Sequence, residues 1–463
     1  MRGGRSLLIL LVVALGLGAY IYFVESERDP AGTDRREKVF AGLDRNDITE
    51  LTIRASGADQ ATTLRRTDGD WTVVEPVQTT ADASAVDAIL SSLETLELER
   101  VIEEAPGNLE PFGLEPADVE VSFRTSDGAS RTLWLGSTTP TSSGLYARTS
   151  DSPRLLLLPI YHRSTFNRTT FDLRNRRVLE LAQATVDEVV LEPSRGPAVT
   201  LTRVDGTWRL AQPIDTRADA ASADSLVSRL SAAQMTSIVH EGDEPTPADL
   251  RSWGLDRPRL TITARTGSAT ATLAIGAERD GSSVYARDLA RPIVFTIDQT
   301  LFSDLNKSAD DLRVRDIFAF SAFSARRLEV ARDAATYVWE KKAGEGDDSS
   351  TRWTQVQPDE RDVNQTTMTD LLNALSTLRA ERFVAQAPAS GSRVEVAVQS
   401  GSAEAPQDER ATLVRAGDSA YAIRPGEPGA AVIPAADFDA VVSHLESLTA
   451  AAESDTDSPD EGQ

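Results

Sequence analysis

The chain has 463 residues, of which 40% are hydrophobic and 26% charged, a composition that allows about three globular domains with hydrophobic cores. Its net charge of −24 argues against nucleic-acid binding, which usually requires a basic face. The absence of cysteine excludes disulfide bonds, thiolate catalysis, cysteine-based zinc sites and a cysteine-linked lipid anchor.

The first predicted element is a transmembrane helix. Nineteen uncharged residues from Ser6 to Val24 would form a helix about 29 Å long, close to the hydrocarbon thickness of a bilayer. Arginines precede this segment and glutamates follow it, so the positive-inside rule places the N-terminus in the cytoplasm. A cleaved signal peptide is the alternative, but bulky residues occupy the place where a small-residue cleavage site would stand.

These features predict a single-pass protein of the bacterial inner membrane with most of the chain on the periplasmic or extracytoplasmic side. We expect a cytoplasmic tip, a transmembrane anchor and a polar linker, at residues 1–5, 6–24 and 25–38 respectively.

After the linker, one pattern occurs three times. A tryptophan stands five residues before a proline, and the copies are offset by 137 and 145 residues. A fixed period of this size indicates that one structural unit has been repeated. The signature residues are Trp71 and Pro76, Trp208 and Pro213, and Trp353 and Pro358. We place module one at residues 39–173, module two at 174–312, a diverged module three at 313–448, and a disordered acidic tail at 449–463.

Each module begins with a predicted strand and a hairpin. Asp68-Gly69 and Asp205-Gly206 separate strand-like runs and are typical of two-residue hairpin turns. In module three a longer polar loop from Ala343 to Thr351 takes the place of this turn. The signature tryptophan alternates with apolar residues and should face inward, and the proline should end its strand.

An amphipathic helix follows the hairpin in each module. Apolar residues recur at helical spacing, and an Asp or Asn near the start is suited to capping the N-terminus. The predicted buried faces comprise Val86, Ile89, Leu90, Leu93 and Leu96; Ala223, Leu226, Val227, Leu230 and Ala233; and Met368, Leu371, Leu372, Leu375 and Leu378. The predicted caps are Asp82, Asp219 and Asn364.

The second half of each module consists of alternating, strand-like runs. Leu133 to Gly136 and Leu273 to Gly276 are interpreted as strands closed by glycine. Trp134 lies between two inward leucines, so the period of two points it outward and makes it our candidate for a partner contact. The fold class is therefore α+β: a transmembrane helix followed by three tandem repeats, each mainly antiparallel sheet with one long amphipathic helix.

In sum, the chain resembles an uncharacterised bacterial family, domain of unknown function 4340. The resemblance rests on the N-terminal anchor, the Trp…Pro pairs and two turns of Gly-Leu-x-x-Pro type, at Gly113 to Pro116 and Gly254 to Pro258. Gly136 and Gly276, followed by Tyr146 and Tyr285, also fit. The resemblance implies a membrane-tethered extracytoplasmic protein that is an accessory partner of ABC-type export systems, of the kind linked to gliding motility. It supplies no catalytic residues.

Candidate chemistry is sparse. His162, His240 and His444 occupy non-equivalent positions, which disfavours a shared metal site. No phosphate loop, His-Glu-x-x-His motif or Gly-x-Ser-x-Gly elbow is present. We therefore predict no catalytic, cofactor or metal site and no enzymatic activity. Arginines at the module boundaries are expected to pair with carboxylates across them, with anion binding as the alternative: Arg174, Arg176, Arg177, Arg313 and Arg315.

The function predicted from these observations is that of a non-catalytic, membrane-anchored scaffold or adaptor. Its expected partner is a membrane protein such as an ABC transporter subunit. Two alternatives stay open: a module that binds cell-wall or surface polysaccharide, and a glycan hydrolase built on paired carboxylates.

Overall fold

The computed structural model describes residues 37–343, 351–402 and 405–450. It divides into two compact units, of which the first ends at Arg176 and the second begins at Arg177. The predicted anchor at residues 6–24 lies outside the described residues, as do most of the linker and residues 451–463 of the tail. Among the helices of the described part, none is long and apolar enough to cross a membrane.

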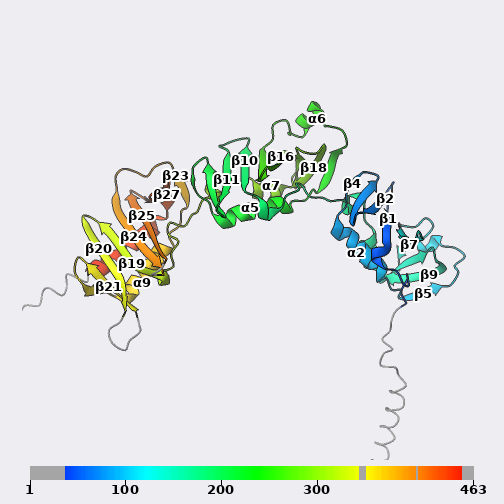
Figure 1. Cartoon of the computed structure of the whole chain (residues 1–463), viewed down its shortest axis with the longest axis horizontal. Helices are drawn as coiled ribbons and strands as arrows, with labels where there is room; N and C mark the ends of the chain where they lie inside the picture. Colours follow the sequence, from blue (N-terminus) through cyan, green and yellow to red (C-terminus); the bar gives the residue numbers. More distant parts are fainter. Residues whose placement is uncertain (1–36, 344–350, 403–404, 451–463) are drawn as a thin grey trace, which may run out of the picture. The chain divides into compact units, whose positions relative to one another are not determined.

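The first unit contains one nine-stranded antiparallel sheet, with strand order β4-β3-β2-β1-β6-β7-β8-β9-β5 (Figure 1). Its strands are β1 Ile48–Arg54, β2 Thr62–Thr67, β3 Asp70–Glu75, β4 Thr79–Thr80, β5 Arg100–Glu103, β6 Val119–Thr125, β7 Ser130–Thr138, β8 Gly144–Thr149 and β9 Ser152–Pro159. Its helices are η1 Arg45–Asp47, α2 Ala83–Glu94, η2 Glu110–Phe112, α3 His162–Phe166 and α4 Thr170–Leu173.

The second unit contains two further nine-stranded sheets in the same order. The first has strands β10 Glu188–Pro193, β11 Val199–Val204, β12 Thr207–Gln212, β13 Thr216–Arg217, β14 Ser237–Glu241, β15 Leu260–Thr266, β16 Ala269–Asp280, β17 Ser283–Asp288 and β18 Ile293–Asp298. Its helices are η3 Gln183–Thr185, α5 Ala220–Ala232, α6 Pro247–Ser252, α7 Gln299–Leu305 and α8 Ala309–Leu312.

The remaining sheet belongs to module three. Its strands are β19 Ala325–Arg332, β20 Ala335–Ala343, β21 Thr351–Gln357, β22 Arg361–Asp362, β23 Arg382–Val384, β24 Ser392–Gly401, β25 Pro406–Ala416, β26 Ser419–Ile423 and β27 Ala430–Ile433. Its helices are η4 Ala322–Ser324, α9 Gln365–Ser376 and α10 Ala435–Ala450. The α+β class and the threefold repetition are therefore confirmed, while the bounds of the modules stay predictions.

The shared strand order explains the position of the helix. In each repeat the first four strands lead to one edge of the sheet, and the next strand after the helix lies at the opposite edge. The helix thus connects the two edges and lies along its own sheet, as Figure 1 shows for α2, α5 and α9. Sequence alone did not reveal this connection, because edge pairing joins residues far apart in the chain.

Four of the five residues predicted for each helix face lie in the helix and are buried, whereas the fifth (Leu96, Ala233 or Leu378) is buried just after the helix ends. Val86, Ile89, Leu90 and Leu93 are buried in α2, and the equivalent residues of α5 and α9 are buried too. The capping prediction is also confirmed. The side chains of Asp82, Asp219 and Asn364 accept hydrogen bonds from backbone N–H groups in the first turn of their helices.

The hairpins follow from the Asp-Gly pairs. Asp68 and Gly69 have φ of 53° and 97°, and Asp205 and Gly206 have φ of 50° and 80°. Positive φ at both central residues matches the right-handed twist of the flanking strands, and glycine adopts it without steric cost. The three strands that carry the signature tryptophan end immediately before the signature proline. The loop that replaces the turn in module three lies outside the described residues at 344–350.

The ends of the repeats differ. In modules one and two the chain breaks into two short helices, α3 with α4 and α7 with α8, and the second of each pair starts with a capping box. In module three a single continuous helix, α10, takes their place and packs on α9. The predicted tail therefore begins too early, because Thr449 and Ala450 still belong to α10. The sequence interpretation did not identify this helix.

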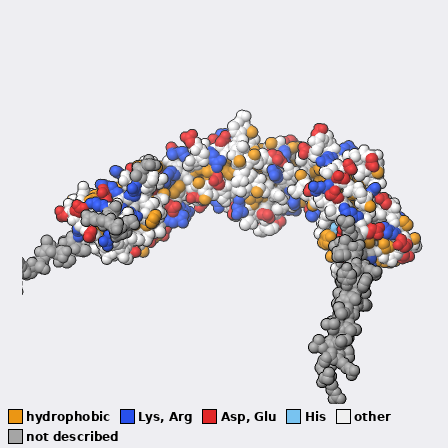
Figure 2. Space-filling view, turned by 60° about the horizontal axis from the view of Figure 1, so that its bottom comes forward, with side chains coloured by type: hydrophobic (Ala, Val, Ile, Leu, Met, Phe, Trp, Pro, Cys, Tyr) orange, Lys and Arg blue, Asp and Glu red, His pale blue; other side chains and the backbone are white. Residues whose placement is uncertain are grey.

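On one face of the molecule, charged side chains of both signs are intermixed. On the face shown in Figure 2, Lys and Arg side chains are interspersed with Asp and Glu over the described parts. Such mixing allows an acidic protein to form many local ion pairs, each of which contributes little on its own.

Candidate functional site

The signature tryptophans belong to the cores rather than to a surface. Trp208 is 2% exposed and Trp353 5% exposed, while Trp71 packs half-buried against the core of module one. The Trp208 indole N–H donates to Asp224 at 2.8 Å, and the Arg203 guanidinium lies 4.8 Å from the ring centroid. These tryptophans therefore hold the hairpin to the helix face, as their alternation predicted.

A second apolar cluster covers the other face of the sheet in modules one and two. Leu109, Leu114 and Leu155 form it in module one, with Phe112, Trp134 and Tyr146 packed against them. The equivalent cluster in module two consists of Leu255, Ala274 and Val294, with Val239, Leu250 and Trp253 against them. The segment around the Gly-Leu turn supplies half of the residues in each cluster. This segment therefore packs over the second face of the sheet and covers it.

The two glycines interpreted as strand ends have a different role. β7 continues past Gly136 to Thr138, and β16 continues past Gly276 to Asp280. A Cβ on Gly136 would lie 2.2 Å from the carbonyl oxygen of Phe112, and one on Gly276 would lie 2.3 Å from that of Trp253. Glycine is needed because the covering turn approaches the strand backbone directly. The interpretation as a strand end was wrong, since only the fold brings the turn there.

Trp134 lies on this second face, opposite the buried Leu133 and Leu135. Its ring is half-buried in the second cluster, and the Arg148 guanidinium lies 5.5 Å from its centroid. In module two the equivalent residue is the small Ala274, and the large aromatic side chain of this cluster is Trp253 from the covering turn. A contact between Trp134 and a partner protein stays a prediction.

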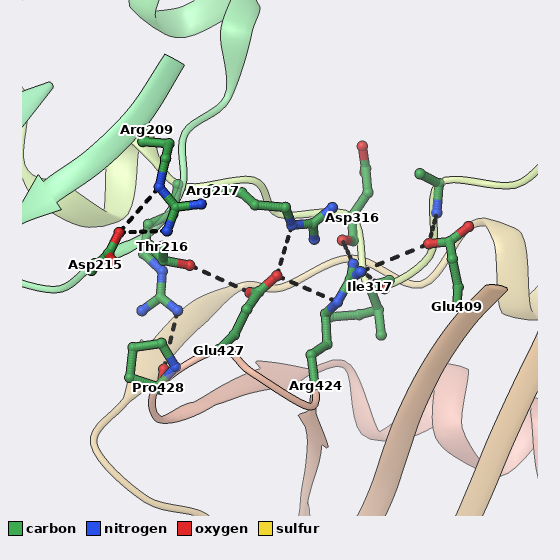
Figure 3. A network of polar contacts seen from close by, with 12 residues as sticks. Arg209, Asp215, Thr216, Arg217, Asp316, Ile317, Glu409, Arg424, Glu427 and Pro428 are labelled. Atoms are coloured by element: carbon green, nitrogen blue, oxygen red, sulfur yellow. Dashed lines mark hydrogen bonds and ion pairs between the residues drawn. The ribbon is translucent and has the colours of Figure 1, made fainter. Parts of the chain in front are cut away.

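The candidate functional site is a polar network at the joint between modules two and three, which we call the joint network (Figure 3). Its centre is Glu427, in the turn between β26 and β27. One carboxylate oxygen accepts a hydrogen bond from Arg217 Nε at 2.7 Å and lies 3.5 Å from Arg424 Nε. The Thr216 hydroxyl lies 3.5 Å from the other oxygen. Since Thr216 and Arg217 form β13 of module two, this carboxylate connects the two modules.

Arg424 extends the joint network to the connecting chain. Its Nη1 donates to the carbonyl oxygen of Ile317 at 2.6 Å, and its Nη2 lies 3.8 Å from Glu409. Glu409 in turn accepts the backbone N–H of Ala319 at 2.8 Å. Burial and the neighbouring Arg217 guanidinium lower the pKa of Arg424, while Glu427 and Glu409 oppose the shift. The guanidinium stays charged at neutral pH, because an arginine pKa starts above 12.

A comparable arginine contact holds the start of module two. Arg291, in the turn before β18, donates to the carbonyl oxygens of Arg177 at 3.2 Å and Val178 at 2.7 Å. In each of these modules an arginine near the last strands thus fastens the module's own first residues to its sheet.

Three of the five boundary arginines, Arg176, Arg313 and Arg315, differ from one another in their contacts. Arg313 is buried, stacks 3.8 Å from the centroid of the Phe383 ring and donates to the carbonyl oxygen of Pro428 at 3.4 Å. Arg176 lies 5.6 Å from the Phe171 ring. Arg315 does reach a carboxylate across the predicted boundary, since Asp311 is 3.8 Å away. A shorter ion pair across this boundary, 2.7 Å to Glu427, comes from Arg217, which the sequence interpretation missed.

Glu427 also escaped the sequence interpretation. It stands between Gly426 and Pro428 in a turn that has no counterpart of equal length in the other modules, so neither periodicity nor repetition points to it. Its partners Thr216 and Arg217 can be identified only from the tertiary structure, which places β13 beside the β26–β27 turn.

The histidines lie in separate surroundings. His162 is buried on α3 beside Phe166, and burial lowers its pKa. His240 lies in β14, where its Nε2 is 2.7 Å from the carbonyl oxygen of Asp243. His444 lies in α10. Within residues 37–343, 351–402 and 405–450, no group of three or more His, Asp or Glu residues is arranged to hold a metal ion.

Replacing Glu427 by glutamine should loosen the joint. The change keeps the shape but removes the charge that faces Arg217 and Arg424, and hydrogen bonds to charged groups contribute about 1.5–3 kcal/mol. We expect the joint to open about tenfold more often. The chain contains no cysteine, so spin labels can be placed specifically at Leu289→Cys and Glu395→Cys, which are exposed positions in the two modules. The measured distance distribution should broaden.

The matched control is Asp215→Ala. Asp215 lies in the same region but pairs with Arg209 inside module two, and its side chain is 71% exposed. This variant should leave the distance distribution unchanged. An equal width in wild type and Glu427→Gln would show that the joint network does not set the geometry of the joint.

Comparison with known families adds one match. The model described as Domain of unknown function (DUF4340) matches residues 71–252 and 208–395, two overlapping stretches that each begin at a signature tryptophan. No curated protein and no solved structure matches the chain significantly.

Proposed function

The chain belongs to the DUF4340 family, and from this premise we propose that it is a membrane-anchored extracytoplasmic scaffold or adaptor without catalytic activity. The observation that carries the proposal is the joint network. Glu427 and Arg217 come from neighbouring modules and form an ion pair, so these charged side chains hold the two modules together. A scaffold needs this property, because it must present surfaces at a defined spacing.

The repeats support the same function. Three copies of one fold with different outer surfaces offer several binding faces on one chain, as repeat proteins generally do. Two of the repeated signature tryptophans, Trp208 and Trp353, are buried in the cores of their modules. They therefore offer no stacking face to a sugar ring, which favours the adaptor over the polysaccharide-binding alternative.

Location and partner are part of the proposal. We place the chain in the bacterial inner membrane through residues 6–24, with the N-terminus in the cytoplasm and the modules in the periplasm. The partner is a subunit of an ABC-type export system, as the family resemblance implies. Protease added to spheroplasts should digest modules one to three, and protection of the modules would contradict this orientation.

The adaptor role is tested by cross-linking in intact cells followed by purification of the full chain from detergent extracts. Permease or ATPase subunits of an exporter should be recovered with the wild type. Their yield should change when the chain carries the joint variant Glu427→Gln. Asp215→Ala serves as the control with wild-type yield. Repeated recovery of no exporter subunit would refute the adaptor role. Binding of the purified chain to cell-wall polysaccharide would instead support the alternative.

A further inference from the structure

One surface of module three differs in charge from the same surface in its two sister modules. Each module starts with a short 3₁₀ turn, η1, η3 or η4, that leads into the first strand. The strand pairing makes residues around this turn equivalent. Thr49 and Arg326 are equivalent, because each has no partner at the register shift in its first strand. Arg66 and Lys341 are equivalent, because they pair with Trp71 and Trp353 respectively.

A shared hydrogen bond confirms the equivalence. Arg66 donates to the carbonyl oxygen of Asn46 at 3.2 Å in module one, and Lys341 donates to that of Phe323 at 3.2 Å in module three. Phe323 therefore occupies the middle of a turn that holds Asn46 in module one and Ala184 in module two. The backbone of the turn is the same, and only the side chains distinguish module three.

Phe323 is 89% exposed, far above the other large hydrophobic residues of the described part. The Lys341 ammonium lies 4.9 Å from its ring centroid and supports one side of the ring. A single exposed apolar side chain is ordinary on a protein surface, but a phenyl ring held almost entirely in water has a hydration cost. The ring is thus positioned to be buried by something outside the module.

Four positions near Phe323 are basic in module three but neutral or acidic in the sister modules. Four equivalent positions around the turn carry four positive charges in module three and two negative charges in each of the others. They are Arg326, Arg327, Lys342 and Arg352 in module three; Thr49, Glu50, Thr67 and Asp70 in module one; and Asp187, Glu188, Val204 and Thr207 in module two.

Part of this charge is neutralised inside the module. Arg327 pairs with Glu340, and Lys342 pairs with Glu360. Within the described residues, Arg326 and Arg352 have no carboxylate at ion-pair distance. Lys342 and Arg352 also stand directly opposite each other in the β20–β21 pair. Like charges in that position are destabilising, so this arrangement reduces the stability of module three.

From this comparison we infer that Phe323, Arg326, Lys341 and Arg352 form a contact surface for an anionic lipid bilayer. The phenyl ring enters the boundary between headgroups and acyl chains, and the cations bind headgroup phosphates. A bilayer suits these features because it buries a projecting ring without a complementary pocket. The charge complementarity is local, since the chain as a whole carries −24 and would be repelled elsewhere. The inference does not depend on the adaptor role.

The test uses the full chain with a single environment-sensitive fluorophore. A label at Ser321→Cys, directly before η4, reports on the surface, and the same label at Ala182→Cys, directly before η3 in module two, is the control. The chain is reconstituted into vesicles of phosphatidylcholine with and without phosphatidylglycerol. We expect a blue shift at position 321 only with phosphatidylglycerol, lost when salt rises from about 0.1 M to about 1 M, and no shift at position 182.

The decisive variant replaces three residues by those of module two: Phe323→Ala, Arg326→Asp and Arg352→Thr together. The same turn accepts these residues in module two, so the variant should fold. Two cations are lost and one acidic residue is gained, so we expect the equilibrium constant for bilayer contact to fall at least about tenfold.

Several outcomes would overturn the inference. These are equal emission in both lipid compositions, an equal response at positions 182 and 321, or a response to soluble polyglutamate without a response to vesicles, which would replace the bilayer by an acidic protein segment. Failure of the predicted anchor is distinguishable. It would abolish flotation of every variant with neutral vesicles, whereas failure of this surface leaves flotation intact and removes only the fluorophore response.

Discussion

Replacing Trp208 by alanine should destabilise module two by about 3–5 kcal/mol, the cost expected when a large buried aromatic side chain leaves a cavity. Trp208 is 2% exposed, and its indole N–H donates to Asp224 on α5. The substitution therefore removes both packing and the link between β12 and the helix. Hydrogen exchange of the purified full chain in mild detergent, read on peptides from residues 188–298, reports this loss without interference from the other modules.

The repeat supplies its own control. Trp71 occupies the same place in module one but is only half-buried, so Trp71→Ala should cost clearly less in the corresponding peptides. Equal and small effects at both positions would show that these tryptophans do not hold the cores together.

Replacing Gly276 by alanine should destabilise module two by about 3 kcal/mol, although only one methyl group is added. The new Cβ would lie 2.3 Å from the carbonyl oxygen of Trp253, and backbone cannot move aside as a flexible side chain can. The covering turn at Gly254 and Leu255 would have to separate from the sheet. The expected readout is faster hydrogen exchange in residues 242–259, followed by loss of protection in β16.

Gly281→Ala is the matched control, because no atom lies within 4 Å of the position that its Cβ would take. This variant should be neutral. Module three provides a natural comparison: it lacks the Gly-Leu-x-x-Pro turn and carries the buried Val414 where the other modules have Gly136 and Gly276. Retention of wild-type protection in Gly276→Ala would contradict the close approach of the turn.

Local rules account for the elements that were predicted correctly. Helical spacing of apolar residues identified the faces of α2, α5 and α9, because burial on one side of a helix imposes that period. The Asp-Gly pairs identified two hairpins, because their turn needs positive φ. Repetition then multiplied these signals, since the same pattern in three places is unlikely to arise by chance.

The errors arose where distant segments meet. Gly136 looked like the end of a strand, since the carbonyl oxygen that requires it belongs to Phe112, earlier in the chain. Helix α10 escaped notice because the other modules break at the same place. Trp134 was correctly assigned to the face opposite the main core, but its sequence could not reveal the second cluster that half-buries it.

The sequence by itself determined the threefold repetition, the α+β class, the inward tryptophans and the helix caps, since each follows from short local patterns or from their recurrence along the chain. Only the tertiary structure decided the order of strands in the sheets, the covering turns over Gly136 and Gly276, and the pairing of Arg217 with Glu427. The physical reason is separation along the chain. Arg217 and Glu427 are 210 residues apart, and no periodicity connects a strand edge in one module with a turn in the next.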